Sequence, residues 1–319
     1  MRILVTGANG FVGRNLCFAL CQQQHAVIEV VRALDSSIDG LAQVVTMASI
    51  DANSDWSAAL HNVDVVVHLA ARVHVMTDHA ADPLAEFRQI NVSGTLNLAL
   101  QAAKAGVKRF IFISSVKVNG EHTEIGEPFT EENAANPQDA YGQSKFEAEQ
   151  GLLLLAQQTA MKLVIIRPPL VYGAGVKANF SSMLQAVKRG IPMPLGAIHN
   201  KRSFVYVGNL VSLILRCLDH PLATNQVFLV SDGHDLSTTE LLRACALALG
   251  VKSRLLPVPQ CLIEFTARLL GKRAVAQRLC DNLQVDITKA RTLLDWEPPI
   301  SVADGLKATA LGLMQRKRK

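Results

Sequence analysis

The sequence has few aromatic residues, no long apolar run and no secretion signal. Aromatics make up 5% of its 319 residues, too few for a surface that stacks on nucleic-acid bases. No apolar run approaches the ~18 residues that cross a bilayer, and residues 1–6 hold too short an apolar stretch to begin a signal peptide. We therefore expect a cytoplasmic protein with no membrane span and no nucleic-acid partner.

Paired cysteines and strong charge are also absent. The six cysteines form no Cys-x-x-Cys pair and no Cys/His cluster with zinc spacing, so we expect no metal site and a reducing compartment. Net charge is only +5, part of it in the Arg-Lys-Arg-Lys run at 316–319, which is typical of a solvated tail. With 49% hydrophobic and 18% charged residues, the chain should build a sizeable core.

Short Val- and Ile-rich segments alternate with helical patterns over the first two-thirds of the chain. Apolar segments, of the kind buried on both faces of a sheet, lie at 2–6, 26–31, 63–68, 108–113 and 162–166, with a weaker one at 44–47. Helical patterns lie at 13–23, 56–61, 90–105 and 141–159. This alternation predicts an α/β fold with a Rossmann-type, doubly wound parallel sheet.

The sequence changes in character after Gly173. Gly, Pro and Asn interrupt the chain up to residue 200, and two segments then look extended. These segments are 204–207 and 226–230; helical patterns follow at 237–249 and 259–270, and a last helix begins at Val302. We expect a main domain over 1–170 and a smaller, mixed α/β substrate domain over 171–319, with 226–230 able to return to the main sheet.

A glycine-rich turn follows the first expected strand and opens the first expected helix. It reads Thr-Gly-Ala-Asn-Gly-Phe-Val-Gly over 6–13. In such turns the first glycine permits a tight bend, the second lets backbone approach a pyrophosphate, and the third lets the helix pack on the strand. Because free N–H groups at a helix N-terminus attract anions, Gly7, Gly10 and Gly13 predict a dinucleotide site.

The end of the second expected strand bears on which dinucleotide binds. An acid there commonly holds the adenosine ribose of NAD, but the segment ends Val31-Arg32 and Glu29 falls short of the strand end. Arg32 could pair with the 2′-phosphate of NADP, or it could be a solvated strand-end arginine. NAD and NADP therefore both stay open, and Arg32 favours NADP.

Tyr141 and Lys145 are four residues apart, so on a helix they share one face. A phenol with a pKa of about 10 is a poor base at neutral pH, but a nearby ammonium and an oxidised nicotinamide would lower that pKa. Ser115 follows a strand, at the edge of the sheet where ligands bind, and could hydrogen-bond the same substrate oxygen. Asn91 could cap the helix that it begins or hold a structural water.

These residues together resemble the extended short-chain dehydrogenase/reductase family, in its NAD-dependent epimerase/dehydratase group. The pattern is most similar to the UDP-glucose 4-epimerase-like branch, which includes UDP-N-acetylhexosamine epimerases and 4-keto reductases. The resemblance covers nearly the whole chain, through motifs at 6–13, 68–71, 91–95, 114–115, 141–145, 167–173, 286–291 and 295–298.

The resemblance implies a role for individual positions. The matched catalytic group is Ser115, Tyr141 and Lys145. The implied substrate contacts, at the sugar hydroxyl and the nucleotide diphosphate, are Ser115, Asn179, Phe180 and Arg202. The implied cofactor contacts, taken together with Arg32, are Gly7, Gly10, Phe11, Val12, Gly13, Ile50, Leu69, Ala70, Ala71, Asn91, Tyr141, Lys145 and Pro168.

Several positions depart from the family's pattern. Val116 and Lys117 replace the Asp-Glu pair that follows the catalytic hydroxyl in the dehydratases, so elimination of water lacks its acid and base. Asn119 replaces a usual Tyr, Leu170 stands where epimerases commonly have Asn, and Gly208 stands where many members have Asp. We therefore expect a substrate pocket that differs from that of the standard epimerase.

The resemblance implies an enzyme that transfers hydride at C4 of a nucleotide-diphosphate sugar. A UDP-hexose or UDP-N-acetylhexosamine 4-epimerase is favoured, and a reductase of a UDP-4-keto-6-deoxy-hexosamine is the alternative, which Arg32 supports. A sensor that binds the dinucleotide without chemistry is disfavoured, because Tyr141 and Lys145 are both present. The apolar run 151–156 is compatible with a homodimer face or with burial within one chain.

Overall fold

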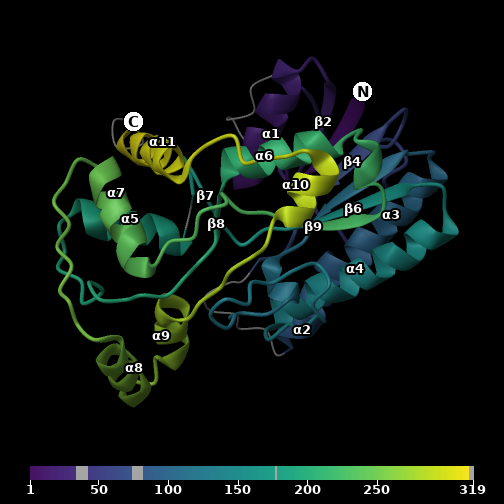
Figure 1. Ribbon diagram of the computed structural model, residues 1–319. Coiled ribbons are helices and arrows are strands. Elements are labelled where there is room, and N and C mark those ends of the chain that lie inside the picture. Colours follow the sequence, from purple (N-terminus) through teal and green to yellow (C-terminus); the bar gives the residue numbers. More distant parts are fainter. Residues whose placement is uncertain (34–41, 74–81, 177, 316–319) are drawn as a thin grey trace.

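A seven-stranded parallel sheet forms the centre of the molecule (Figure 1). The computed structural model describes residues 1–33, 42–73, 82–176 and 178–315, except for the side chains of Ala178 and Asn179. The strand order is β3-β2-β1-β4-β5-β6-β9. The strands are β1 (Arg2–Thr6), β2 (Ala26–Val31), β3 (Gln43–Thr46), β4 (Val65–His68), β5 (Arg109–Ile113), β6 (Lys162–Arg167) and β9 (Gln226–Leu229). The predicted Rossmann-type fold is confirmed.

Helices cover both faces of this sheet. One layer contains α1 (Phe11–Gln22), α6 (Val207–Cys217) and α10 (Thr288–Leu294); the other contains α3 (Thr95–Lys104) and α4 (Ala140–Gln158). Successive strand residues alternate between the layers, so Val5 packs with the first and Leu4 with the second, both fully buried. Double coverage is the reason why the strands are apolar at nearly every position.

A second, separate core lies beyond the end of the sheet, where α5, α7 and α11 gather in Figure 1. Its elements are the parallel pair β7 (Leu170–Tyr172) and β8 (Phe204–Tyr206), with α5 (Ala178–Lys188), α7 (Thr238–Ala248) and α11 (Val302–Gln315). Two further helices, α8 (Gln260–Leu269) and α9 (Arg273–Cys280), pack on each other below it. Residues after 170 therefore form this core, while α6, β9 and α10 return to the main sheet.

The structure corrects several expected helices. The predicted helix at 56–61 is wrong, because these residues form turns. Their apolar spacing arises because Trp56 and Leu60 pack into the core on one face of the sheet. The pattern at 90–105 begins earlier, with α2 (Pro83–Phe87), and continues through a π-helical segment (Arg88–Gly94) into α3. Helices α5, α6, α9 and α10 were not predicted. None of the described helices is long and apolar enough to cross a membrane.

A buried ion pair fastens α4 to the sheet. At the end of β6, Nη2 of Arg167 lies 2.5 Å from Oε2 of Glu149, and its Nε lies 3.0 Å from Oε1. The remaining Nη1 donates to Oδ1 of Asn119 at 3.0 Å. The buried Asn119, where the family usually has Tyr, thus completes the hydrogen bonding of the guanidinium.

Arg167→Met should lower the free energy of unfolding by roughly 3–5 kcal/mol, because the Glu149 carboxylate would stay buried without its partner. The matched control is Arg291→Met, which breaks an exposed pair with Glu297 and should cost less than ~1 kcal/mol. Urea denaturation of both variants measures the difference, and equal losses would contradict the prediction.

Candidate active site

The glycine turn after β1 is packed directly against the end of β4. Gly7 has a φ of +67°, and a Cβ on it would lie 3.0 Å from the backbone N of Ala70. A Cβ on Gly13 would lie 2.2 Å from the Gly7 carbonyl oxygen, and one on Gly10 would lie 3.0 Å from the same atom. Gly10 and Gly13 therefore stand where a side chain would press on the backbone of the turn, and Gly7 where one would press on the predicted contacts Leu69 and Ala70.

The N-terminus of α1 suits a bound diphosphate. Its N-cap residue is Gly10, and among the described residues no side chain caps the helix and no acid lies in its first turn. The first-turn N–H groups, including those of Phe11 and Val12, have no partner within the helix. A turn that keeps backbone close and leaves such donors open fits the pyrophosphate of a dinucleotide.

A buried chain of hydrogen bonds joins Thr6, His68 and Thr95 beneath this edge of the sheet. Nδ1 of His68 lies 2.7 Å from Oγ1 of Thr6, and its Nε2 lies 2.9 Å from Oγ1 of Thr95. Burial, aided by the charge of Lys145, lowers the pKa of His68 to about 3, so the imidazole is neutral. Thr6 also accepts a hydrogen bond from the backbone N of Ala70 at 3.2 Å. His68 was part of a recognised motif, but its positioning role was not predicted.

Asn91 fastens the segment that follows β4. Its Oδ1 accepts from the backbone N of Arg72 at 2.8 Å, and its Nδ2 donates to the Arg72 carbonyl and to Oγ of Ser144, each at 3.0 Å. Because Asn91 lies inside the π-helical segment, the helix-capping alternative is wrong. Both polar atoms of its buried amide have protein partners, so Asn91 holds the backbone at Arg72.

Ile50 lies where the chain after β3 meets the π-helical segment. A Cβ on Gly94 would lie 2.5 Å from the Ile50 carbonyl oxygen, so glycine is required for this approach. Nδ2 of Asn97 donates to the carbonyls of Asp51 and Ser54, at 3.0 and 2.8 Å, and holds the loop in place. The structure thus carries Ile50 to the same edge of the sheet as the glycine turn.

Lys145 and Tyr141 lie one turn apart on α4. The Lys145 side chain is 1% exposed, and its Nζ donates to the Ile113 carbonyl at the end of β5, at 2.8 Å. Ser115 comes two residues after β5, and its Oγ accepts from the backbone N of Lys117 at 3.2 Å. Strands β1, β4 and β5 are adjacent and parallel, so their carboxyl ends lie at one edge of the sheet. The glycine turn and this predicted catalytic group therefore share that edge.

The electrostatics of Tyr141 differ from the expectation. Burial raises its pKa above the ordinary value, and the charge of Asp139 raises it further. Burial also lowers the pKa of Lys145 to about 7, so the lysine is only partly charged at neutral pH. The predicted lowering of the tyrosine pKa by Lys145 is therefore wrong for the chain's own groups, because desolvation dominates.

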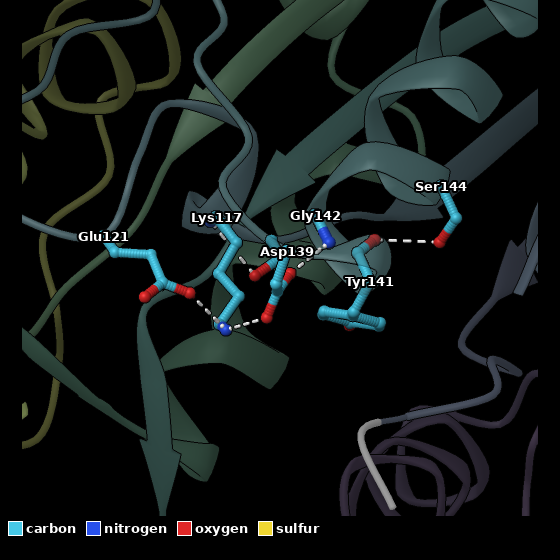
Figure 2. A network of polar contacts seen from close by, with 7 residues as sticks. Lys117, Glu121, Asp139, Tyr141, Gly142 and Ser144 are labelled. Atoms are coloured by element: carbon cyan, nitrogen blue, oxygen red, sulfur yellow. Dashed lines mark hydrogen bonds and ion pairs between the residues drawn. The ribbon is translucent and has the colours of Figure 1, made fainter. Parts of the chain in front are cut away.

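An acid–base cluster that was not predicted stands beside Tyr141 (Figure 2). Asp139 caps α4: its Oδ1 accepts from the backbone N of Gly142 at 2.7 Å, while its Oδ2 accepts from Nζ of Lys117. The same Nζ donates to Oε1 of Glu121 at 2.7 Å. Lys117 stands where the dehydratases have an acidic residue. Its positive charge offsets the negative charge of the Asp139 carboxylate beside the Tyr141 phenol. The sequence offered one signal for this cluster, which was Asp139, three residues before Gly142 at the start of the helix.

The remaining predicted cofactor and substrate residues differ in which of their atoms a ligand could reach. The Pro168 carbonyl accepts from the backbone N of Val116 at 3.0 Å, which ties it to the Ser115 turn. The Phe180 ring is buried in the second core, stacked on Tyr172 at 5.6 Å, so only its backbone is left for a ligand. The Asn179 side chain lies outside the described residues.

Arg202 lies at the junction of the two cores. Its Nη1 donates to the Asp281 carbonyl at 2.9 Å. Burial lowers its pKa, while the charges of Asp281 and Glu121 act in the opposite direction. Because Glu121 also binds Lys117, the predicted diphosphate residue is coupled to the cluster beside Tyr141. Arg32, in contrast, is exposed just after β2.

Comparison with known proteins agrees with this geometry. The model of the NAD dependent epimerase/dehydratase family matches residues 3–231. The chain is 49% identical to the UDP-glucose 4-epimerase of Vibrio cholerae, over 99% of this chain and 97% of that protein. A solved UDP-glucose 4-epimerase of Thermotoga maritima, with UDP-glucose, has a TM-score of 0.79 and 25% identity over 100% of both chains. The UDP-glucuronic acid 4-epimerase of Bacillus cereus, in complex with NAD, has a TM-score of 0.79 at 22% identity over 99% of both, which is a likeness of fold.

A doubly wound sheet with a glycine turn and a Tyr-x-x-x-Lys helix at one edge is the architecture of the short-chain dehydrogenase/reductase enzymes. The match over residues 3–231 is more specific. This chain belongs to the NAD dependent epimerase/dehydratase family, and the family predicted from its motifs is confirmed.

Lys117→Met should raise the pKa of Tyr141 further, because it leaves the Asp139 charge without its cation. The pH profile of kcat should move to higher pH by roughly one pH unit, which is about tenfold in rate at neutral pH. Lys108→Met, which breaks an exposed pair with Asp64, is the control and should keep the wild-type profile. A lower kcat at an unshifted profile would contradict this role.

Proposed function

We propose that this protein is a nucleotide-sugar 4-epimerase that acts on a UDP-hexose or UDP-N-acetylhexosamine. The observation that carries the proposal is the buried Lys145 one turn from Tyr141, fastened to β5 just before Ser115. The 49% identity to the V. cholerae UDP-glucose 4-epimerase over nearly the whole chain supports the substrate class. The same comparison supports the activity over a non-catalytic sensor.

Each residue of the catalytic group has a distinct task in this proposal. Tyr141 removes the proton of the sugar C4 hydroxyl, and Ser115 donates a hydrogen bond to the oxygen as it becomes a carbonyl. Lys145 binds the cofactor ribose. Bound NAD supplies the acceptor, and later the donor, of the hydride. The 4-keto sugar then turns over within the site, so that the hydride would return to the opposite face of C4 while Tyr141 gives its proton back to the C4 oxygen.

The raised pKa of Tyr141 makes its action as a base dependent on the bound cofactor. Desolvation keeps the phenol protonated in the free enzyme. The positive charge of an oxidised nicotinamide would favour the phenolate and offset that cost. The phenol should therefore act as a base more readily when oxidised cofactor is bound.

Cofactor choice within the proposal depends on Arg32. The family is NAD-dependent, whereas the strand end offers an exposed arginine in place of an acid. If Arg32 pairs with a 2′-phosphate, Arg32→Ala should weaken NADP binding about tenfold and leave NAD binding unchanged. Titration calorimetry with both dinucleotides measures this, with Arg243→Ala, which removes an exposed arginine of α7, as the control. Equal affinities of wild type and Arg32→Ala for NADP would remove Arg32 from the cofactor site.

The 4-keto reductase remains the second candidate, and Arg32 is the observation that favours it, because NADPH is the usual reducing cofactor. Incubating the purified protein with UDP-N-acetylglucosamine and no added cofactor separates the two. Formation of the C4 epimer requires a retained dinucleotide and supports the epimerase. Activity only on a 4-keto sugar with NADPH would replace the epimerase by the reductase.

Tyr141→Phe should lower kcat by roughly 10²–10⁴-fold, because it removes the acid–base group and keeps the ring. Tyr206→Phe is the matched control, since it removes a phenol in the second core and should keep most of the activity. Thermal denaturation should show both variants folded. Full activity of Tyr141→Phe would overturn the proposed chemistry.

We further propose a division of labour between the two cores and a homodimer. Residues 1–170, with α6, β9 and α10, bind the dinucleotide, and the second core within 171–319 binds the sugar. Exposed Leu100 on α3 and Leu154 on α4 supply apolar surface for a dimer face on that helical layer. Burial of residues 151–156 within the chain is incomplete, which supports the same interpretation.

A further inference from the structure

The α8–α9 hairpin is the least buried helical part of the protein. None of the ten residues of α8 is buried, and of α9 only Ala276 and Cys280 are. A helix of this length is marginal in water without a packing partner. Figure 1 shows the hairpin projecting beyond the second core, away from the sheet and from α3 and α4.

Exposed apolar side chains are concentrated on this hairpin. Leu262, Phe265 and Leu269 are 50%, 61% and 71% exposed. Their i, i+3, i+7 spacing places all three on one face of α8. Leu270 and Val275 add to this surface, so that five of the 17 exposed large hydrophobic residues in the described part of the chain lie within 262–275. Single exposed leucines are ordinary, but a cluster of this kind marks an interaction surface.

The same hairpin is basic. Residues 260–280 contain four basic residues and one acidic residue, a charge of +3 in a chain of +5. Arg268, Lys272 and Arg278 are exposed, and their side chains make no hydrogen bond or ion pair with any other described residue. Their charge is therefore available to an anionic surface.

The base of the hairpin is rigidly held. The Leu279 carbonyl accepts from Oγ1 of Thr238 at 2.6 Å and from Nδ2 of Asn200 at 3.2 Å. Arg202 donates to the neighbouring Asp281 carbonyl. The hairpin thus has a fixed base beside Arg202 and a tip, around Leu269 and Leu270, that no described element covers.

We propose that the α8–α9 hairpin docks the protein on the surface of an anionic phospholipid membrane. Leu262, Phe265 and Leu269 enter the boundary between headgroups and acyl chains, and the surrounding arginines and lysine meet the anionic headgroups. Apolar side chains on one face and basic side chains beside them are what an in-plane helix needs, and basic residues near the surface strengthen binding to anionic lipids. The hairpin lies on the bilayer and does not cross it.

Two other occupants are less suited to this surface. A second copy of the hairpin would bring two +3 segments together, which is unfavourable at an interface. A nucleic acid would use the basic residues but leave the leucines and Phe265 exposed. A membrane uses both features at once, and it is compatible with the dimer face proposed on α3 and α4.

Co-sedimentation with phospholipid vesicles tests the proposal on the full-length protein. Vesicles of phosphatidylcholine with about one-third phosphatidylglycerol should bind the wild type, and binding should weaken as salt rises. Pure phosphatidylcholine vesicles should bind it several-fold less. The double variant Phe265→Ser/Leu269→Ser should lose roughly tenfold in affinity for anionic vesicles, and Arg268→Gln/Lys272→Gln should lose both affinity and salt dependence.

Control variants separate docking from general effects. Leu247→Ser removes an apolar side chain that is 83% exposed on α7 and should bind vesicles like the wild type. Phe265→Trp should show a blue-shifted emission with anionic vesicles, since the new indole would enter the bilayer. Turnover of soluble UDP-sugar should be unchanged in the double variants, because these residues are exposed and outside the proposed site.

Several results would overturn the docking proposal without touching the proposed activity. One is the absence of binding to anionic vesicles, and another is equal binding by the wild type and Phe265→Ser/Leu269→Ser. Dimers that dissociate in that variant would assign the face to a second copy. Double-stranded DNA that competes fully with vesicles, at an unchanged Phe265→Trp emission, would reduce the surface to a binder of polyanions.

Discussion

The site depends on the burial of one amino group. Nζ of Lys145 lies in the interior and donates to the carbonyl that ends β5. A cation there is tolerated because that carbonyl and the face of Phe112, 4.4 Å away, stabilise it. Two further polar ties follow on the buried side of α4, from Ser144 to Asn91 and from Glu149 to Arg167. Together they hold the helix that carries Tyr141 along its length.

The same burial explains why the sequence revealed which residues form the predicted site but not their pKa values. Spacing alone placed Tyr141 and Lys145 on one helical face, and the apolar strands fixed the edge at which they lie. Their pKa values depend on how much solvent the fold removes, and no spacing contains that information. Likewise Lys117 and Asp139 meet only because the turn after β5 packs on the start of α4, where Gly142 leaves room for the Lys117 carbonyl.

Local patterns predicted the strands of the sheet closely, because strands covered on both faces must be apolar throughout. They failed where long-range packing decides. Residues 56–61 have helical spacing but serve as a plug on the sheet, and α6 was hidden behind the extended pattern at 204–207. The return of β9 beside β6 was open in the sequence, since pairing across sixty residues leaves no local signal.

The π-helical segment at 88–94 constrains how this lineage can vary. Its wide turn accommodates one more residue than an α-helical turn, and so sets the rotation of α3 relative to α2. Removing a single residue there would close the wide turn to an α-helical one and change which groups Asn91, which lies inside it, can reach. Changes of length should therefore accumulate in the neighbouring loops, and the spacing from Phe87 to Thr95 should stay constant among functional descendants of this gene.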